Sequence, residues 1–148
     1  MIDIPQIIND LQKRYCTTNP YELADKLDIT ISRCNLGTIR GYYYKAYRVK
    51  QIFLNINLER NQEKFVLSHE LGHAVLHPDC NTMFLKANGR LSVDKMEIQA
   101  NKFAIQLLIS DEQLQEYEGY SISFISRILG YSEELIELRL KNPWAIYT

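Results

Sequence analysis

The fold of this chain is decided by the stretch Val66-Leu67-Ser68-His69-Glu70-Leu71-Gly72-His73-Ala74-Val75-Leu76-His77. It contains all three histidines of the chain, spaced four residues apart. Residues four apart stack on one face of a helix, so His69 and His73 can direct their imidazoles at a single point. The residues around them are apolar or small, as a helix buried with its metal ligands requires. The stretch therefore predicts a buried helix that carries half of a metal site.

The central five residues of this stretch have the H-E-x-x-H arrangement of zinc peptidases. A catalytic zinc needs three protein ligands and an open position for water, and His69 and His73 would supply two of the three. Glu70 is the next residue round the helix and would be the general base. It would take a proton from the attacking water and pass it to the leaving amine of a cleaved peptide bond. Zn²⁺ is therefore the expected cofactor.

Glu97 is the first choice for the third ligand. It lies 24 residues beyond His73 on a second predicted helix, and this gap leaves room for a loop and a return of the chain. Asn101 is one turn further along the same face. It can hydrogen-bond the free N–H of a ligand imidazole and so hold that ring in place.

Two rivals for the third ligand stay open at this point. Asp79 lies ten residues after His69, where some zinc peptidases place their third ligand. Those enzymes need glycine where this chain has Leu76, because the helix has to turn there. His77 is on the same helix, but a rigid helix places it about 12 Å from His69 along the axis, which is too far for one ion.

Length and composition indicate an ordinary globular protein. The chain has 148 residues, 46% of them hydrophobic and 24% charged, with a net charge of −1. We predict one domain over 1–148, with a helical C-terminal part from about 110–148. The charge gives no sign of nucleic-acid binding, and no apolar run is long enough to span a membrane. The N-terminus lacks the pattern of a signal peptide, and Cys16, Cys34 and Cys80 are odd in number, so we expect a reducing, cytoplasmic environment.

The periodicity of the chain changes from helical to strand-like and back. Helices are expected at about 5–15 and from Pro20, where Asn19 is the cap and Glu22 stands at the acidic position of a capping box. Short strands are expected within 29–32, 38–44 and 52–58, arranged as an antiparallel meander. Further helices are expected at 61–77, 93–109, 122–129 and 133–141, with a short one capped by Ser110. A loop is expected at 79–91.

Several weaker signals suggest how a substrate is held. The segment 29–58 contains five basic residues, several tyrosines and no acidic residue. This pattern can indicate a substrate-docking surface, but it is more typical of a solvated strand face. A tyrosine or arginine there can also stabilise an oxyanion, but the sequence does not single one out. The strand 52–58 is the closest in sequence to the metal helix, and we expect substrate to add to its edge. The last two helices mimic a helix-turn-helix, yet Glu133, Glu134 and Glu137 would repel phosphates, so direct DNA binding is not expected.

The two motif-bearing helices resemble those of the ImmA/IrrE family of metallo-endopeptidases. The resemblance spans residues 19 to 108 in four blocks. The blocks are Asn19–Ala24, Ile52–Asn55, Phe65–His77 and the pattern Glu97, Ala100, Asn101, Phe103, Ala104 that continues to Leu107 and Leu108. The first two blocks look like the family's second helix and the strand before its metal helix. The last two look like its two metal helices, and together they make the resemblance specific.

The resemblance implies a fold, an activity and a partner. It implies an α+β, zincin-like fold in which a small three-stranded antiparallel sheet packs against a predominantly helical single domain. His69, His73 and Glu97 would be zinc ligands, Glu70 the base and Asn101 a neighbour of the ligands. Relatives often have Asp at the position of Asn101, so this chain keeps the hydrogen-bond acceptor and gives up the charge.

The implied activity is cleavage of a helix-turn-helix repressor that silences a prophage, a mobile element or a stress regulon. The alternative is a non-catalytic anti-repressor with a structural or lost metal site, which would act on the repressor by contact alone. Neither reading requires a membrane or direct contact with nucleic acid.

Overall fold

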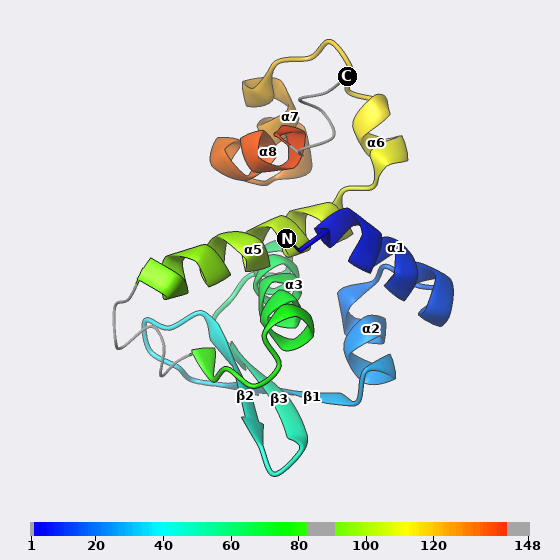
Figure 1. Ribbon diagram of the computed structural model, residues 1–148. Helices are drawn as coiled ribbons and strands as arrows, with labels where there is room; N and C mark the ends of the chain where they lie inside the picture. Colours follow the sequence, from blue (N-terminus) through cyan, green and yellow to red (C-terminus); the bar gives the residue numbers. More distant parts are fainter. Residues whose placement is uncertain (1, 83–90, 142–148) are drawn as a thin grey trace.

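A computed structural model describes residues 2–82 and 91–141 of the chain. The described residues form seven helices and one three-stranded sheet that lies at one end of the molecule, opposite α6, α7 and α8, so the predicted α+β class is confirmed (Figure 1). The helices are α1 (Ile4–Tyr15), α2 (Pro20–Lys26), α3 (Arg60–Leu76), α5 (Leu91–Leu108), α6 (Asp111–Gln115), α7 (Ile122–Leu129) and α8 (Glu133–Leu140). The strands are β1 (Ile29–Cys34), β2 (Gly41–Ala46) and β3 (Val49–Asn55). Most of the predicted loop 79–91 lies outside the described residues.

The helices begin where short polar side chains satisfy their first backbone amides. Asn19 Oδ1 accepts hydrogen bonds from the amides of Tyr21 and Glu22 at the start of α2, as predicted. The predicted capping box is wrong in one detail, because Glu22 accepts a hydrogen bond from Thr17 Oγ1 at 2.6 Å. Thr17 Oγ1 in turn accepts the Asn19 amide. Serines 110, 121 and 132 cap α6, α7 and α8 in the same way.

The sheet is mixed, which corrects the predicted antiparallel meander. Its order is β1-β3-β2, with β3 parallel to β1 and antiparallel to β2. The chain therefore passes from β1 to the far edge, forms β2, and returns as β3 between the two. Asn55 holds the crossing segment by donating hydrogen bonds from Nδ2 to the carbonyls of Gly37 and Ile39. Periodicity predicted the strands, but it carries no information on which strand lies in the middle.

The main hydrophobic core lies between the sheet, α3 and the first two helices. α3 passes through this core and is buried from Val66 to Ala74. Its N-terminal turn is tied to two other elements, because Glu63 accepts hydrogen bonds from Tyr21 in α2 and Arg33 in β1. The hydrogen bond from Arg33 lowers the pKa of Glu63, although burial opposes the shift. The N-terminal turn of α3 is therefore held against α2 and β1.

α5 crosses α3 at close range (Figure 1). The approach depends on Gly72, since a Cβ at this position would meet Phe103 Cβ at 3.0 Å and Ala100 Cα at 3.1 Å. The backbones of the two helices can approach closely because Gly72 has no side chain and Ala100 has a small one. This crossing brings the two predicted halves of the metal site together.

The C-terminal helices form a second, smaller hydrophobic cluster against the end of α5. Ile105 of α5 and Ile109, which follows directly after α5, pack there with Ile125 and Ile136. Arg139 on α8 is buried and donates a hydrogen bond from Nε to the carbonyl of Ile109. None of the described helices combines the length and apolar character that a membrane span requires.

Candidate metal centre

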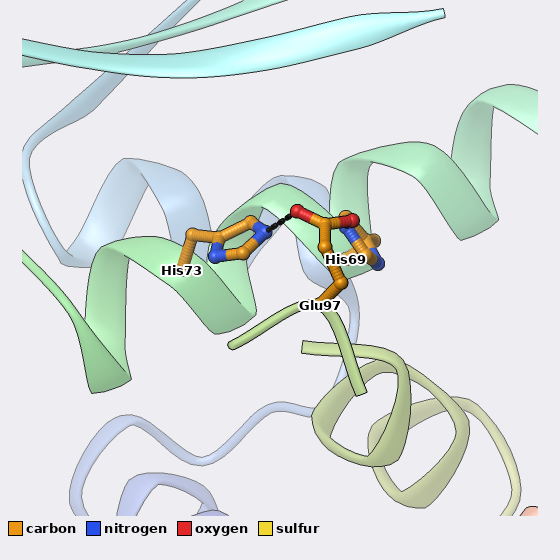
Figure 2. A group of neighbouring side chains, drawn as sticks. All are labelled: His69, His73 and Glu97. Atoms are coloured by element: carbon orange, nitrogen blue, oxygen red, sulfur yellow. Dashed lines mark hydrogen bonds and ion pairs between the residues drawn. The ribbon is translucent and has the colours of Figure 1, made fainter. Parts of the chain in front are cut away.

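Two imidazoles and one carboxylate meet where α3 and α5 cross. Glu97 reaches between the two rings, with Oε2 at 3.0 Å from His69 Nε2 and Oε1 at 2.8 Å from His73 Nε2 (Figure 2). The possible ligand atoms of these three residues lie within 4.8 Å of one another. The structure thus brings together, from the two helices α3 and α5, the three residues that sequence reasoning selected.

Asn101 lies beside this group, one turn beyond Glu97. Its Oδ1 is 2.7 Å from His69 Nδ1. An amide oxygen can only accept a hydrogen bond, so this contact places a proton of His69 on Nδ1. His69 Nε2 then faces Glu97, toward the centre of the group, where a metal ion would replace the proton of that contact.

The two rival ligands lie elsewhere. Asp79 forms an ion pair with Lys45, at 2.8 Å from its Nζ. His77 is the C-cap residue of α3, one turn beyond His73 and two turns beyond His69. Its ring centroid is 6.2 Å from that of His73. Among the residues that the structure describes, His69, His73 and Glu97 are the group able to share a metal ion.

The charges of the site are coupled through these contacts. Burial opposes the charged form of His69, but its hydrogen bond to Glu97 and the charges of Glu70 and Glu97 outweigh burial and raise the pKa of His69. Burial also opposes ionisation of Glu97, yet hydrogen bonds from His69 and His73 hold its pKa well below the usual range for a carboxyl group. The two imidazoles therefore favour the ionised form of Glu97, which is the form that binds a metal ion.

The donor set fits a zinc ion. A tetrahedral zinc with bonds of about 2.0–2.1 Å keeps its ligand atoms about 3.4 Å apart, so only small side-chain movements separate the present contacts from coordination. Two nitrogens and one oxygen are a common ligand set for catalytic zinc, with one position left for water. A divalent cation would take the place of the protons that the imidazoles share with Glu97.

Glu70, the neighbour of His69 in α3, contacts the segment that follows α3. It is 1% exposed, and its Oε2 lies 3.4 Å from Thr82 Oγ1. Thr82 is itself buried and contacts the backbone of Tyr43 in β2. Sequence reasoning did not single out Thr82, because a threonine after a helix carries no pattern that marks it as a neighbour of a catalytic group.

Comparison with known proteins agrees with this geometry. Residues 24–141 match the peptidase family described as the IrrE N-terminal-like domain. The chain belongs to this family. The resemblance noted in the two metal helices is thereby confirmed, and the chain is placed among metal-dependent peptidases.

Two relatives, one from a phage and one from a bacterium, match the chain over almost its whole length. The "Uncharacterized immunity region protein 2" of Bacillus phage phi105 is 41% identical over 146 residues, which cover 94% of this chain and 92% of the phage protein. The "Metallopeptidase ImmA" of Bacillus subtilis (strain 168) is 33% identical over 136 residues, covering 92% of this chain and 76% of that protein.

A solved structure shares the fold. The chain is similar to a "Mycobacterium tuberculosis transcriptional regulator", with a TM-score of 0.61 and 16% sequence identity. The match covers 93% of this chain but only 46% of the regulator, so the shared part is less than half of that larger protein. At this identity the likeness describes the fold alone.

Proposed function

We propose that this chain is a zinc-dependent endopeptidase that cleaves a helix-turn-helix transcriptional repressor of a prophage, mobile element or stress regulon at a specific site. The observation that carries the proposal is the meeting of His69, His73 and Glu97 beside Glu70. This set contains three ligands for a catalytic metal and a separate carboxylate as base. Membership of the peptidase family supports the same reaction.

The residues divide the work of peptide hydrolysis. His69, His73 and Glu97 would hold the zinc ion, and Asn101 would keep the His69 ring turned toward it. Zinc bound there supplies Lewis-acid chemistry, since it polarises a peptide carbonyl and makes water easier to deprotonate. Glu70 accepts the proton of the attacking water and then passes it to the nitrogen of the departing peptide.

The proposed substrate rests on the names of the relatives. One is described as an immunity region protein of a phage, and another as the metallopeptidase ImmA. A peptidase in such a region is well placed to remove the repressor that maintains the silent state. A helix-turn-helix repressor encoded beside this chain would therefore be the first substrate to test. Cys16, Cys34 and Cys80 are all free, which supports action in the reducing cytoplasm.

The test is cleavage of that repressor by purified protein and by its Glu70→Gln variant. Glutamine has the shape of glutamate but accepts no proton, so the variant should bind zinc normally and lose at least a thousandfold in cleavage rate, at the upper end of typical general-base contributions of about 10²–10⁴. Cleavage is followed by mass spectrometry of the products, and zinc content by atomic absorption. Removal of zinc with a chelator should stop the wild-type reaction, and added zinc should restore it.

The same variant separates the enzyme from a non-catalytic anti-repressor. An anti-repressor acts by contact, so its Glu70→Gln form would still relieve repression in a reporter strain without cutting the repressor. Cleavage at the wild-type rate by Glu70→Gln would disprove the role of Glu70 as base.

A further inference from the structure

β2 is an edge strand that lies directly over the metal helix. β3 pairs with only one side of it, and Tyr43 in the middle of β2 is fully buried in the core shared with α3. Successive residues of a strand direct their amides to opposite sides, so residues two apart direct them to the same side. The amides of Tyr43 and Lys45 bond outside the sheet, so they mark the free edge of β2. The predicted edge at 52–58 is wrong, because most of that segment lies in β3 at the centre of the sheet.

The segment that follows α3 covers this free edge. Its hydrogen bonds to β2 go to two residues of that strand, Tyr43 and Lys45. Tyr43 donates its amide to Thr82 Oγ1 at 3.0 Å and its hydroxyl to the carbonyl of Pro78 at 2.6 Å. Lys45 donates its amide to Asn81 Oδ1 at 2.9 Å. Segment 78–82 thus runs beside β2 and pairs with it, but at the two amides it uses side-chain oxygens where a paired strand would use carbonyls.

Thr82 connects the edge of β2 to the proposed base. Its hydroxyl lies 3.4 Å from the carbonyl oxygen of Tyr43 and 3.4 Å from Glu70 Oε2. A hydroxyl has one proton, so it can donate fully to only one of these oxygens at a time. The edge of β2 that Thr82 occupies is therefore next to the group that would activate water.

We propose that Asn81 and Thr82 cap the edge of β2 in place of an extended substrate backbone, so that a polypeptide substrate has to displace their side chains before it can be cut. The proposal rests on the proposed peptidase function. Each amide has a single proton, so Tyr43 and Lys45 cannot pair with a substrate while Thr82 and Asn81 hold them. An extended chain that adds to a sheet edge needs these same groups. The cap explains how a strand edge beside a reactive centre is kept from pairing with other chains.

Asn81 provides a clean way to open the cap, because its hydrogen bond is with the Lys45 amide and, unlike that of Thr82, does not involve Glu70. In Asn81→Ala, hydrogen exchange at the Lys45 amide, measured by NMR, should accelerate about fivefold, the effect of losing one hydrogen bond. Exchange at the Tyr43 amide should stay near its wild-type rate. Asn81→Asp keeps an acceptor oxygen and should protect Lys45 as the wild type does. Asn9→Ala, an exposed change on α1, is the control for the loss of an amide side chain.

Binding is measured with fluorescein-labelled β-casein, an unfolded polypeptide, on zinc-loaded Glu70→Gln protein so that nothing is cut. Adding Asn81→Ala should tighten casein binding about fivefold in fluorescence anisotropy, and bound casein should slow exchange at Lys45 and Tyr43. Adding Asn81→Asp or Asn9→Ala should leave the affinity unchanged. Equal or weaker binding by the Asn81→Ala form would overturn the cap, as would unchanged exchange at Lys45. The Asn81→Ala protein with Glu70 intact is also tested for cleavage. If Asn81→Ala tightens casein binding but this protein cuts neither casein nor the repressor, the cap stands and the proposed peptidase function is refuted.

Discussion

The quality of the metal site depends on how one imidazole is turned. Asn101 Oδ1 accepts a hydrogen bond from His69 Nδ1, while Nδ1 of His73 has no partner within the described part of the chain. Asn101 is therefore the side chain seen to orient a proposed ligand. An aspartate at this position would add a negative charge and make the imidazole a stronger donor to the metal. Asparagine keeps the orientation and omits the charge.

Asn101→Ala is expected to weaken zinc binding about 10–100-fold, because such partners of ligating histidines contribute on this scale. Competition with a chromophoric chelator at neutral pH measures the affinity. Asn101→Asp is the matched variant, and it should bind zinc at least as tightly as the wild type. Zinc affinity that is the same in Asn101→Ala and the wild type would remove Asn101 from the site.

At the scale of elements, the crossing of α3 and α5 is what assembles the site, and Gly72 sets its distance. Gly72→Ala gains about 0.5–1 kcal/mol from helix propensity. The new Cβ would meet Phe103 Cβ at 3.0 Å and Ala100 Cα and O at 3.1 Å, contacts that only a shift of α5 relieves. Overpacking of this kind costs about 1–3 kcal/mol, so a net loss of about 1 kcal/mol in the free energy of unfolding is expected.

The shift should also reduce zinc affinity, since Glu97 and Asn101 move with α5. Urea unfolding and chelator competition measure the two effects. Ile98→Ala is the control on the same helix, because Ile98 is 50% exposed and its loss leaves the crossing intact. Full stability and full zinc affinity in Gly72→Ala would show that the crossing is not limited by this contact.

The elements also show what the sequence could predict. Caps such as Asn19 and Ser110 act within a few residues, so the helix starts were predictable to within a residue or two. The spacing of His69 and His73 is a property of one helix, and it was visible for the same reason. The order of the sheet was not, because the partner of β1 is chosen by packing across the whole chain. Asn81 and Thr82 escaped notice because their meaning comes only from the strand that they cap.

At the scale of the whole molecule, one helix belongs to two hydrophobic clusters. Phe103 and Leu107 of α5 pack in the main core, while Ile105 and Ile109 pack with the C-terminal helices. The C-terminal end of α5 and the residue after it therefore contribute side chains to both clusters. If α5 unfolds, both clusters lose part of their packing. A chain that is one domain over 1–148, as predicted, should therefore unfold in one cooperative transition.

Arg139→Met tests this coupling from the far end of the molecule. Arg139 is 3% exposed and donates to the carbonyl of Ile109 and to Asp111, so its loss leaves a buried carbonyl without that donor. Asp111 is largely exposed and returns to water, and the expected loss is therefore moderate, about 2 kcal/mol. Urea unfolding is followed by NMR at Leu67 in the main core and Ile136 in the C-terminal cluster. Because α5 is shared, both midpoints should fall together in the variant; a lower midpoint at Ile136 with an unchanged one at Leu67 would mean that the C-terminal helices fold as a separate unit.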